Sequence, residues 1–291
     1  MISVPAEGRG GSGVTVAGAP APPECPNLPQ AMTEADEEAL LAVALEAARG
    51  AGAELRARFG HRQHGVRAKS GPTDLVSDAD LAAEAAIRDV LRARRPEDAI
   101  LAEEGGATAG GALRWVVDPL DGTTNFLFGI PVWGVSVACE DADGGLVGVV
   151  LDPMRDECFA ATRSGVPTLD GEPIRGRGEG ELANALVATG FAYDAAVRAR
   201  QAEVITRLLP RVRDIRRMGA AAIDLCWTAC GRFDAFYERG LNPWDIAAGG
   251  LIAERAGLQV RRLPETDDQP SGLVVTRDAL MDEILALVST P

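Results

Sequence analysis

Residues 115–126, WVVDPLDGTTNF, decide the fold, because an apolar strand runs there directly into two aspartates and a helix start. Pro119 holds Asp118 in an extended conformation, so that Asp121 can face the same point from the far side of the turn. Residues 122–124 can then open a helix, whose first N–H groups and positive dipole end suit a phosphate. The pattern predicts a buried strand that ends in an acidic, anion-binding site.

Three further acidic clusters lie at strand ends or helix starts. An apolar strand at residues 99–102 ends in Glu103, residues 69–80 precede a helix, and Pro243 suits a helix start that places Asp245 in the first turn. Carboxylates that converge in a chain with two His and no clustered Cys suit a hard cation such as Mg²⁺. Together with the phosphate site, they predict metal-assisted hydrolysis of a phosphate ester.

The remaining sequence alternates between helical and strand patterns and predicts a mixed α/β fold in two parts. Helices are expected at residues 35–59, 78–94, 196–209, 220–230, 243–256 and 279–288. Strands are expected at residues 99–102, 115–117, 133–138, 146–151, 157–162, 185–189, 215–218, 234–237 and 273–276. A Gly/Pro-rich connector at 165–180 divides the chain into a predicted α+β domain at 32–170, with most of the acids, and an α/β domain at 171–291, with Asp245.

Composition narrows the class of protein. The 291 residues carry 29 Lys and Arg against 43 Asp and Glu, a formal net charge of −14. This acidity argues against a nucleic-acid or anionic-membrane binder, because such proteins present basic surfaces. No stretch approaches the roughly 20 apolar residues of a membrane span. Five dispersed Cys suit reduced thiols, so we expect a cytoplasmic protein.

The first 31 residues differ from the rest in composition. They are rich in Gly, Ala and Pro and lack the basic and apolar regions of a signal peptide. We expect residues 1–31 to form a disordered tail, and we expect translation to begin at Met32, where Thr33 can cap an acidic helix start.

The run at 118–126 and the run WDIAAG at 244–249 resemble the two signatures of the inositol monophosphatase family. The members of this family are lithium-sensitive, Mg²⁺-dependent phosphatases. Glu103 and residues 219–222 also fall at matching places, and the resemblance covers about residues 38–290. It implies an α/β (α+β) fold, a layered α/β/α/β/α sandwich of the inositol monophosphatase and fructose-1,6-bisphosphatase type, assembled as a homodimer.

The resemblance also implies two to three Mg²⁺ ions in each active site. The first would be held by Glu103, Asp118 and the backbone carbonyl of Leu120. The second would be held by Asp118, Asp121 and Asp245, so that Asp118 bridges the two ions. A third, weaker ion would depend on Glu103 and water.

Catalytic roles follow from the same resemblance. Thr123, paired with Asp80, would orient and deprotonate the attacking water, and Asp74 would support the region around Thr123. Lys69, the only lysine of the chain, would reach the phosphate or waters bound to the metals. The N–H groups of Gly122 and Thr123 would receive the phosphate.

The resemblance also implies a substrate pocket. Glu238 would hydrogen-bond a substrate hydroxyl, Gly219 and Ala221 would line the same pocket, and Asp121 and Asp245 would also face the substrate. The residues after Thr123 resemble those of true inositol monophosphatases and their bacterial relatives, so the expected substrate is inositol 1-phosphate, a small phosphorylated polyol. Two alternatives stay open: a histidinol-phosphate or broad-range sugar-alcohol phosphatase, and, from another class, a regulatory factor in rRNA transcription antitermination.

Overall fold

The computed structural model describes residues 32–61, 64–69, 71 and 75–289. The chain from Thr33 onward forms a compact unit of its own. The predictions for the tail at 1–31 and for Asp74 concern residues outside this description, and the boundary near residue 170 stays a prediction.

Helices and strands alternate along this unit much as the sequence predicts. The helices are α1 (Glu34–Arg58), α2 (Asp78–Arg94), α3 (Thr123–Leu127), α4 (Ala195–Leu208), α5 (Ala221–Ala229), α6 (Pro243–Arg255) and α7 (Asp278–Val288), with short 3₁₀ turns η1 (Leu182–Asn184) and η2 (Leu209–Arg211). The strands are β1 (Arg67–Ala68), β2 (Leu75–Val76), β3 (Ala99–Ala102), β4 (Gly106–Thr108), β5 (Arg114–Asp121), β6 (Gly134–Asp141), β7 (Gly144–Asp152), β8 (Glu157–Thr162), β9 (Thr168–Leu169), β10 (Glu172–Pro173), β11 (Leu186–Thr189), β12 (Asp214–Arg216), β13 (Ala235–Arg239), β14 (Gln259–Leu263) and β15 (Gly272–Thr276).

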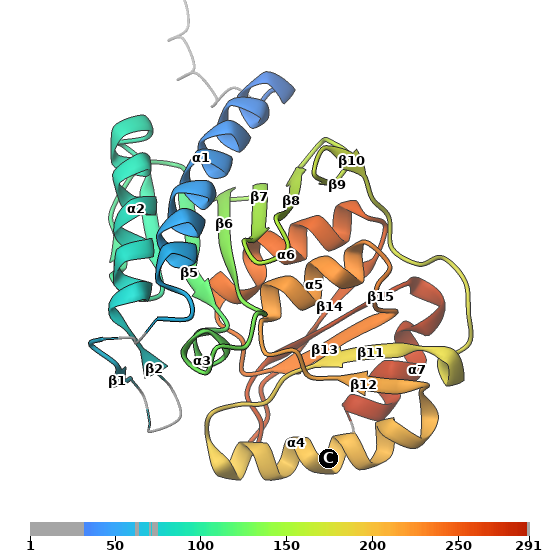
Figure 1. The fold of residues 1–291 in the computed structure, drawn as a ribbon. Helices are drawn as coiled ribbons and strands as arrows, with labels where there is room; N and C mark the ends of the chain where they lie inside the picture. Colours follow the sequence, from blue (N-terminus) through green and yellow to red (C-terminus); the bar gives the residue numbers. More distant parts are fainter. Residues whose placement is uncertain (1–31, 62–63, 70, 72–74, 290–291) are drawn as a thin grey trace, which may run out of the picture. The chain divides into compact units, whose positions relative to one another are not determined.

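An eight-stranded sheet has the order β10-β9-β8-β7-β6-β5-β3-β4 and is antiparallel except where β3 pairs with β5. Helices α1 and α2 cover one face of it (Figure 1). Both helices begin at capping boxes, with Thr33 and Ser77 as the caps. Apolar residues of both helices, such as Leu55 and Ile87, are fully buried. Central strands covered on both faces are therefore buried and mainly apolar, as Val135, Val137 and Cys139 of β6 illustrate.

A five-stranded sheet follows, with the order β12-β11-β13-β15-β14. Its strands alternate between two apolar clusters, because successive side chains point to opposite faces. Ala188 and Phe236 pack with residues of α5, α6 and the eight-stranded sheet, whereas Val187 and Tyr237 pack with α4 and α7. Helices α5 and α6 thus lie between the two sheets, and the layers follow the predicted α/β/α/β/α order (Figure 1).

Strand β5 is longer than the predicted 115–117, and its far end is irregular. It pairs with β6 as far as Asp118, loses register, and rejoins β6 where Asp121 faces Gly134. Pro119 lies in this bulge, where a residue without an N–H is tolerated. The bulge lies at the carboxyl end of β5, and Asp118 and Asp121 on either side of it line the same cavity, as expected from the sequence.

Strand β14 was not predicted, because Arg261 and Arg262 make it look like a solvated connection. It is an edge strand, so that its charged side chains reach solvent. No helix within the described residues is long and apolar enough to cross a bilayer.

Candidate active site

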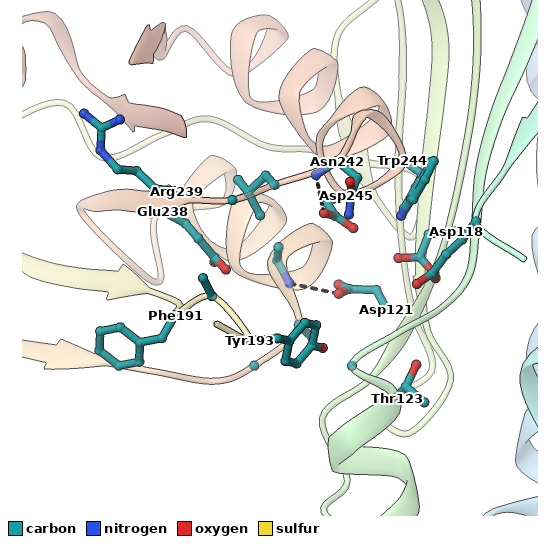
Figure 2. Close-up of a pocket in the computed structure, with 18 of the residues that line it drawn as sticks. Asp118, Asp121, Thr123, Phe191, Tyr193, Glu238, Arg239, Asn242, Trp244 and Asp245 are labelled. Carbon is teal, nitrogen blue, oxygen red and sulfur yellow. Dashed lines mark hydrogen bonds between the residues drawn. The ribbon is translucent and has the colours of Figure 1, made fainter. Parts of the chain in front are cut away.

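A cavity of about 480 Å³ lies where the end of β5 meets the starts of α5 and α6 (Figure 2). It contains nearly all of the residues that the sequence singled out, which are Lys69, Glu103, Asp118, Leu120, Asp121, Gly122, Thr123, Gly219, Ala221, Glu238 and Asp245. Asp80 is not on the cavity wall but is buried behind Thr123. The structure thus gathers the predicted residues, while their individual roles stay predictions.

Asp121 is held by the start of α5, although 100 residues separate them. Its two carboxylate oxygens accept the N–H groups of Ala221 at 3.0 Å and Ala222 at 2.8 Å. Because the N-terminus of a helix has unpaired N–H groups and a positive dipole end, it stabilises this buried carboxylate. The contact fixes Asp121 in the cavity and ties α5 to the end of β5.

Asp245 enters the cavity from the first turn of α6. Its Oδ2 accepts the N–H of Asn242 at 2.6 Å in a capping box, with Pro243 at the first helical position. The Ser136 hydroxyl of β6 donates to the Trp244 carbonyl at 3.1 Å, which joins the start of α6 to the eight-stranded sheet. Figure 2 shows Asp118, Asp121 and Asp245 arranged around one space.

These carboxylates are electrostatically strained as a group. Burial raises the pKa of Asp118 well above its usual range, and the negative charges of Glu103, Asp121 and Asp245 raise it further. Burial likewise raises the pKa of Asp245 well above its usual range, and that of Asp121 to about 6. The low-dielectric cavity therefore disfavours four negative charges unless a cation compensates them.

The donor chemistry of this group fits a hard divalent cation, since every ligand it offers is an oxygen. As the side chains stand, however, no three described His, Cys, Asp or Glu residues are arranged as a metal site. Each carboxylate has another partner: Asp118 accepts the Leu120 N–H at 2.9 Å, Asp121 caps α5 and Asp245 caps α6.

Lys69 contacts the acids at the end of β3. Its Nζ donates to Glu103 Oε1 at 2.6 Å and also to Glu104 Oε1. Burial acts to lower the pKa of Lys69, but the two carboxylates outweigh burial and raise it. Burial raises the pKa of Glu104 to about 7. The cation therefore compensates part of the negative charge, and Glu104, to which the sequence assigned no role, belongs to this network.

Thr123 and Asp80 form the predicted pair. The Thr123 Oγ1 lies 2.9 Å from Asp80 Oδ1 and 3.0 Å from the Leu120 carbonyl. Asp80 is the third residue of α2, and its Oδ2 accepts the N–H and hydroxyl of Ser77 at 2.8 and 2.7 Å. The capping box of α2 thus orients the carboxylate that faces Thr123.

The opposite wall of the cavity consists of loop residues. Phe191 and Tyr193 follow β11, and Arg217 precedes the left-handed Gly219. Glu238, at the end of β13, points in from behind; a Cβ on Gly190 would lie 2.1 Å from its carboxylate oxygen, so this packing requires glycine. Burial raises the pKa of Glu238 to about 8, although the Arg217 charge opposes this.

Sequence reasoning did not assign Phe191, Tyr193 or Asn242 to the cavity. The loop after β11 has no periodicity that would reveal its direction. Asn125 was quoted only as part of the motif, yet its Nδ2 donates to the Val132 carbonyl at 2.7 Å and the Met218 carbonyl at 2.8 Å. It therefore fixes the loop that carries Arg217 against α3.

Known proteins resemble this chain in sequence. Residues 36–289 match the inositol monophosphatase family. Inositol-1-monophosphatase SuhB of Mycobacterium tuberculosis is 43% identical over 263 residues, which cover 86% of this chain and 90% of that protein. The Nus factor SuhB of Escherichia coli K12 is 40% identical over 221 residues, which cover 75% of this chain and 83% of that protein.

Solved structures resemble it in fold. The extragenic suppressor protein suhB of Bartonella henselae superposes with a TM-score of 0.79 at 33% identity, covering 86% of this chain and 98% of that one. The Thermotoga maritima IMPase superposes with a TM-score of 0.77 at 31% identity, covering 86% of this chain and 96% of that one.

Together, the layered fold and acidic cavity define an enzyme of the phosphatase class, a phosphoric monoester hydrolase. The chain belongs to the inositol monophosphatase family, which confirms the predicted resemblance.

Proposed function

We propose that the protein hydrolyses inositol 1-phosphate to inositol and phosphate in a Mg²⁺-dependent reaction. The observation that carries the proposal is the convergence of Asp118, Asp121 and Asp245 on one cavity that also contains the Thr123–Asp80 pair. The name of the M. tuberculosis relative, at 43% identity, supports this substrate. We also propose a cytoplasmic homodimer, on the family resemblance.

Two to three Mg²⁺ ions would be held by the carboxylates at the acidic side of the cavity. In the proposed arrangement Glu103, Asp118 and the Leu120 carbonyl hold one ion, and Asp118, Asp121 and Asp245 hold another. When bound, the ions neutralise charge on the phosphoryl group and on the attacking and leaving oxygens. Their binding also relieves the mutual repulsion that raises the pKa of Asp118.

The protein's own groups then handle the water and the phosphate. Thr123 Oγ1 can orient a water, and its contact with Asp80 at 2.9 Å provides a carboxylate that accepts a proton through the threonine hydroxyl. Asp74 would support Thr123, and Lys69 would reach the phosphate once it leaves the acids it now contacts. The N–H groups of Gly122 and Thr123, at the start of α3, would receive the phosphate.

The leaving group would lie against the loop wall. Glu238 would bond an inositol hydroxyl, while Gly219 and Ala221, together with Asp121 and Asp245, would face the ring; all of them line the cavity. A cavity of about 480 Å³ accommodates a phosphorylated six-membered ring.

A phosphate-release assay tests the proposal. Inositol 1-phosphate, histidinol phosphate, adenosine 3′,5′-bisphosphate and fructose 1,6-bisphosphate are compared with Mg²⁺ and with EDTA. We expect the highest kcat/KM for inositol 1-phosphate and no release in EDTA. A preference for histidinol phosphate, or equal rates on many sugar-alcohol phosphates, would replace the substrate assignment by the first alternative.

The antitermination role has a separate basis, because the E. coli relative at 40% identity is named a Nus factor. The presence in this chain of Asp118, Asp121 and Asp245 favours the enzyme, since a purely regulatory protein has no need of them. Absence of Mg²⁺-dependent release from every ester in the panel would favour the regulatory role instead.

A further inference from the structure

Two charged residues on α2 form a buried ion pair outside the cavity wall. Glu84 and Arg88 lie one helical turn apart, and Arg88 Nε donates to Glu84 Oε1 at 2.6 Å. Their side chains are 6% and 10% exposed. A buried ion pair needs further hydrogen bonds to offset the cost of removing both charges from water. For this pair, backbone groups of residues 104–106 supply those bonds.

That turn joins β3 to β4. The N–H groups of Glu104 and Gly105 both donate to Glu84 Oε2, at 2.9 and 3.1 Å. On the other side of the turn, Arg88 Nη2 donates to the Gly106 carbonyl at 3.1 Å. A Cβ at Gly105 would lie 2.3 Å from Glu84 Oε1, so only glycine permits this close approach. Both members of the ion pair therefore clamp the turn through charge-assisted bonds.

Glu103 lies in the clamped turn. The residue before it, Ala102, is fixed in β3 by pairing with Val117 of β5, and the residue after it, Glu104, is fixed by Glu84. The backbone of Glu103 is therefore held on both sides, with its carboxylate directed into the cavity, where it raises the pKa of Asp118.

We propose that Glu84, supported by Arg88, is a positioning residue for the metal site. By holding the β3–β4 turn, it presents the Glu103 carboxylate opposite Asp118 before a cation arrives, so that less conformational entropy is lost on binding. The inference rests on the proposed function, in which Glu103 holds Mg²⁺.

The test uses the full chain, Mg²⁺ alone as the probe, and thermal unfolding as the readout besides activity. In Glu84→Gln the amide cannot accept from Arg88 and the two N–H groups at once without turning its own NH₂ toward a donor. We expect the Mg²⁺ concentration that gives half-maximal stabilisation to rise about tenfold to a hundredfold, as is typical when a group that orients a metal ligand is lost. Half-saturation of phosphate release by Mg²⁺ should rise in parallel.

A matched control exists in the turn between β6 and β7. There Arg163 bonds Asp141 at 2.6 and 3.0 Å and donates to the Gly144 and Gly145 carbonyls at 2.9 Å each, away from the active-site cavity. Asp141→Asn should lower the melting temperature and leave the Mg²⁺ half-saturation within about twofold of the unmodified protein.

If Glu84→Gln fails to fold, Arg88→Met takes its place. We then expect a smaller rise in the half-saturating Mg²⁺ concentration, of about threefold to tenfold, because the bonds from Glu104 and Gly105 to Glu84 remain.

Glu103→Gln separates this inference from the proposed function. Suppose that Mg²⁺ stabilises the unmodified protein against thermal unfolding and stabilises Glu103→Gln only weakly. If Glu84→Gln (or Arg88→Met in its place) is then stabilised at the same Mg²⁺ concentrations as the unmodified protein, only the positioning role is overturned. If the unmodified protein shows no Mg²⁺ stabilisation, the metal site of the proposed function fails and the positioning role fails with it.

Discussion

The two ends of the cavity are built in opposite ways. The acidic end, which consists of Glu103, Asp118, Asp121 and Asp245, comes from strand ends and first helical turns. The loop end, which consists of residues 191–193 and Arg217, comes from connections between elements. Asp118 is 2% exposed, whereas Tyr193 is 49% exposed. Regular elements therefore fix the buried carboxylates, whereas the loop end consists of connections, which vary more readily in sequence than the elements they join.

Asp118→Asn tests the acidic end and should have the largest effect. The amide keeps the size of the side chain but removes the negative charge that is shared between the two proposed ions. We expect kcat for phosphate release to fall by several orders of magnitude at saturating Mg²⁺. Steady-state kinetics with inositol 1-phosphate measures the change.

Asp152→Asn is the control for that substitution. Asp152 is also a fully buried aspartate at a strand end; its Oδ1 accepts the N–H of Met154 at 3.0 Å, but it does not line the cavity. The Asp152→Asn variant should be less stable than the unmodified protein, with a kcat within a few fold of it. Near-normal Mg²⁺-dependent turnover by Asp118→Asn would refute the metal assignment.

The acidic end could be predicted from the sequence because its signals are local. A proline between Asp118 and Asp121, a proline before Asp245 and an apolar run before Glu103 each place a carboxylate at the end of a regular element. Convergence then follows from the layered fold. The bond from Asp121 to the start of α5 could not be predicted, because no local pattern connects residues 100 positions apart.

The loop end could not be predicted in the same way. Tyr193 lines the cavity just before the Asp194 cap of α4. The place of α4 depends on packing with residues of β11, β13 and α7, which are distant in sequence. Strand β14 could not be predicted for a related reason: its position at a sheet edge permits polar residues, which mask the strand pattern. The position of Tyr193 and the existence of β14 both depend on tertiary contacts that the local sequence does not contain.

Thr123→Val tests the hydroxyl that lies beside the acidic end, at the start of α3, and should have an intermediate effect. Valine preserves the shape of the buried side chain but removes the hydroxyl that lies 2.9 Å from Asp80. We expect kcat to fall about 10²-fold to 10³-fold, the range for losing acid–base assistance, while the Mg²⁺-dependent rise in melting temperature is kept. Thr123→Ser, which retains the hydroxyl, should recover most of the activity. Near-normal kcat in Thr123→Val would show that the hydroxyl takes no part in proton transfer.

Glu238→Gln tests the buried carboxylate of β13 that lies beside the loop end in the cavity, and its effect, on stability, is expected to be the smallest. Burial raises the pKa of Glu238 from an ordinary 4.5 to about 8. Between those pH values the folded protein keeps a proton that the unfolded chain has lost, so this group lowers the free energy of unfolding as pH rises. The loss is at most about 1.4 kcal/mol for each pH unit crossed, and partial solvent access reduces it.

In EDTA, therefore, Glu238→Gln should match the unmodified protein near pH 5 and become the more stable of the two, by roughly 1–4 kcal/mol, near pH 8. Urea unfolding at both pH values measures the difference. Glu283→Gln, which changes an exposed glutamate on α7, should leave the pH dependence of the unmodified protein intact. An identical pH dependence in Glu238→Gln and the unmodified protein would show that Glu238 ionises as freely as a surface group, and that water reaches this side of the cavity at β13 as it does at Tyr193.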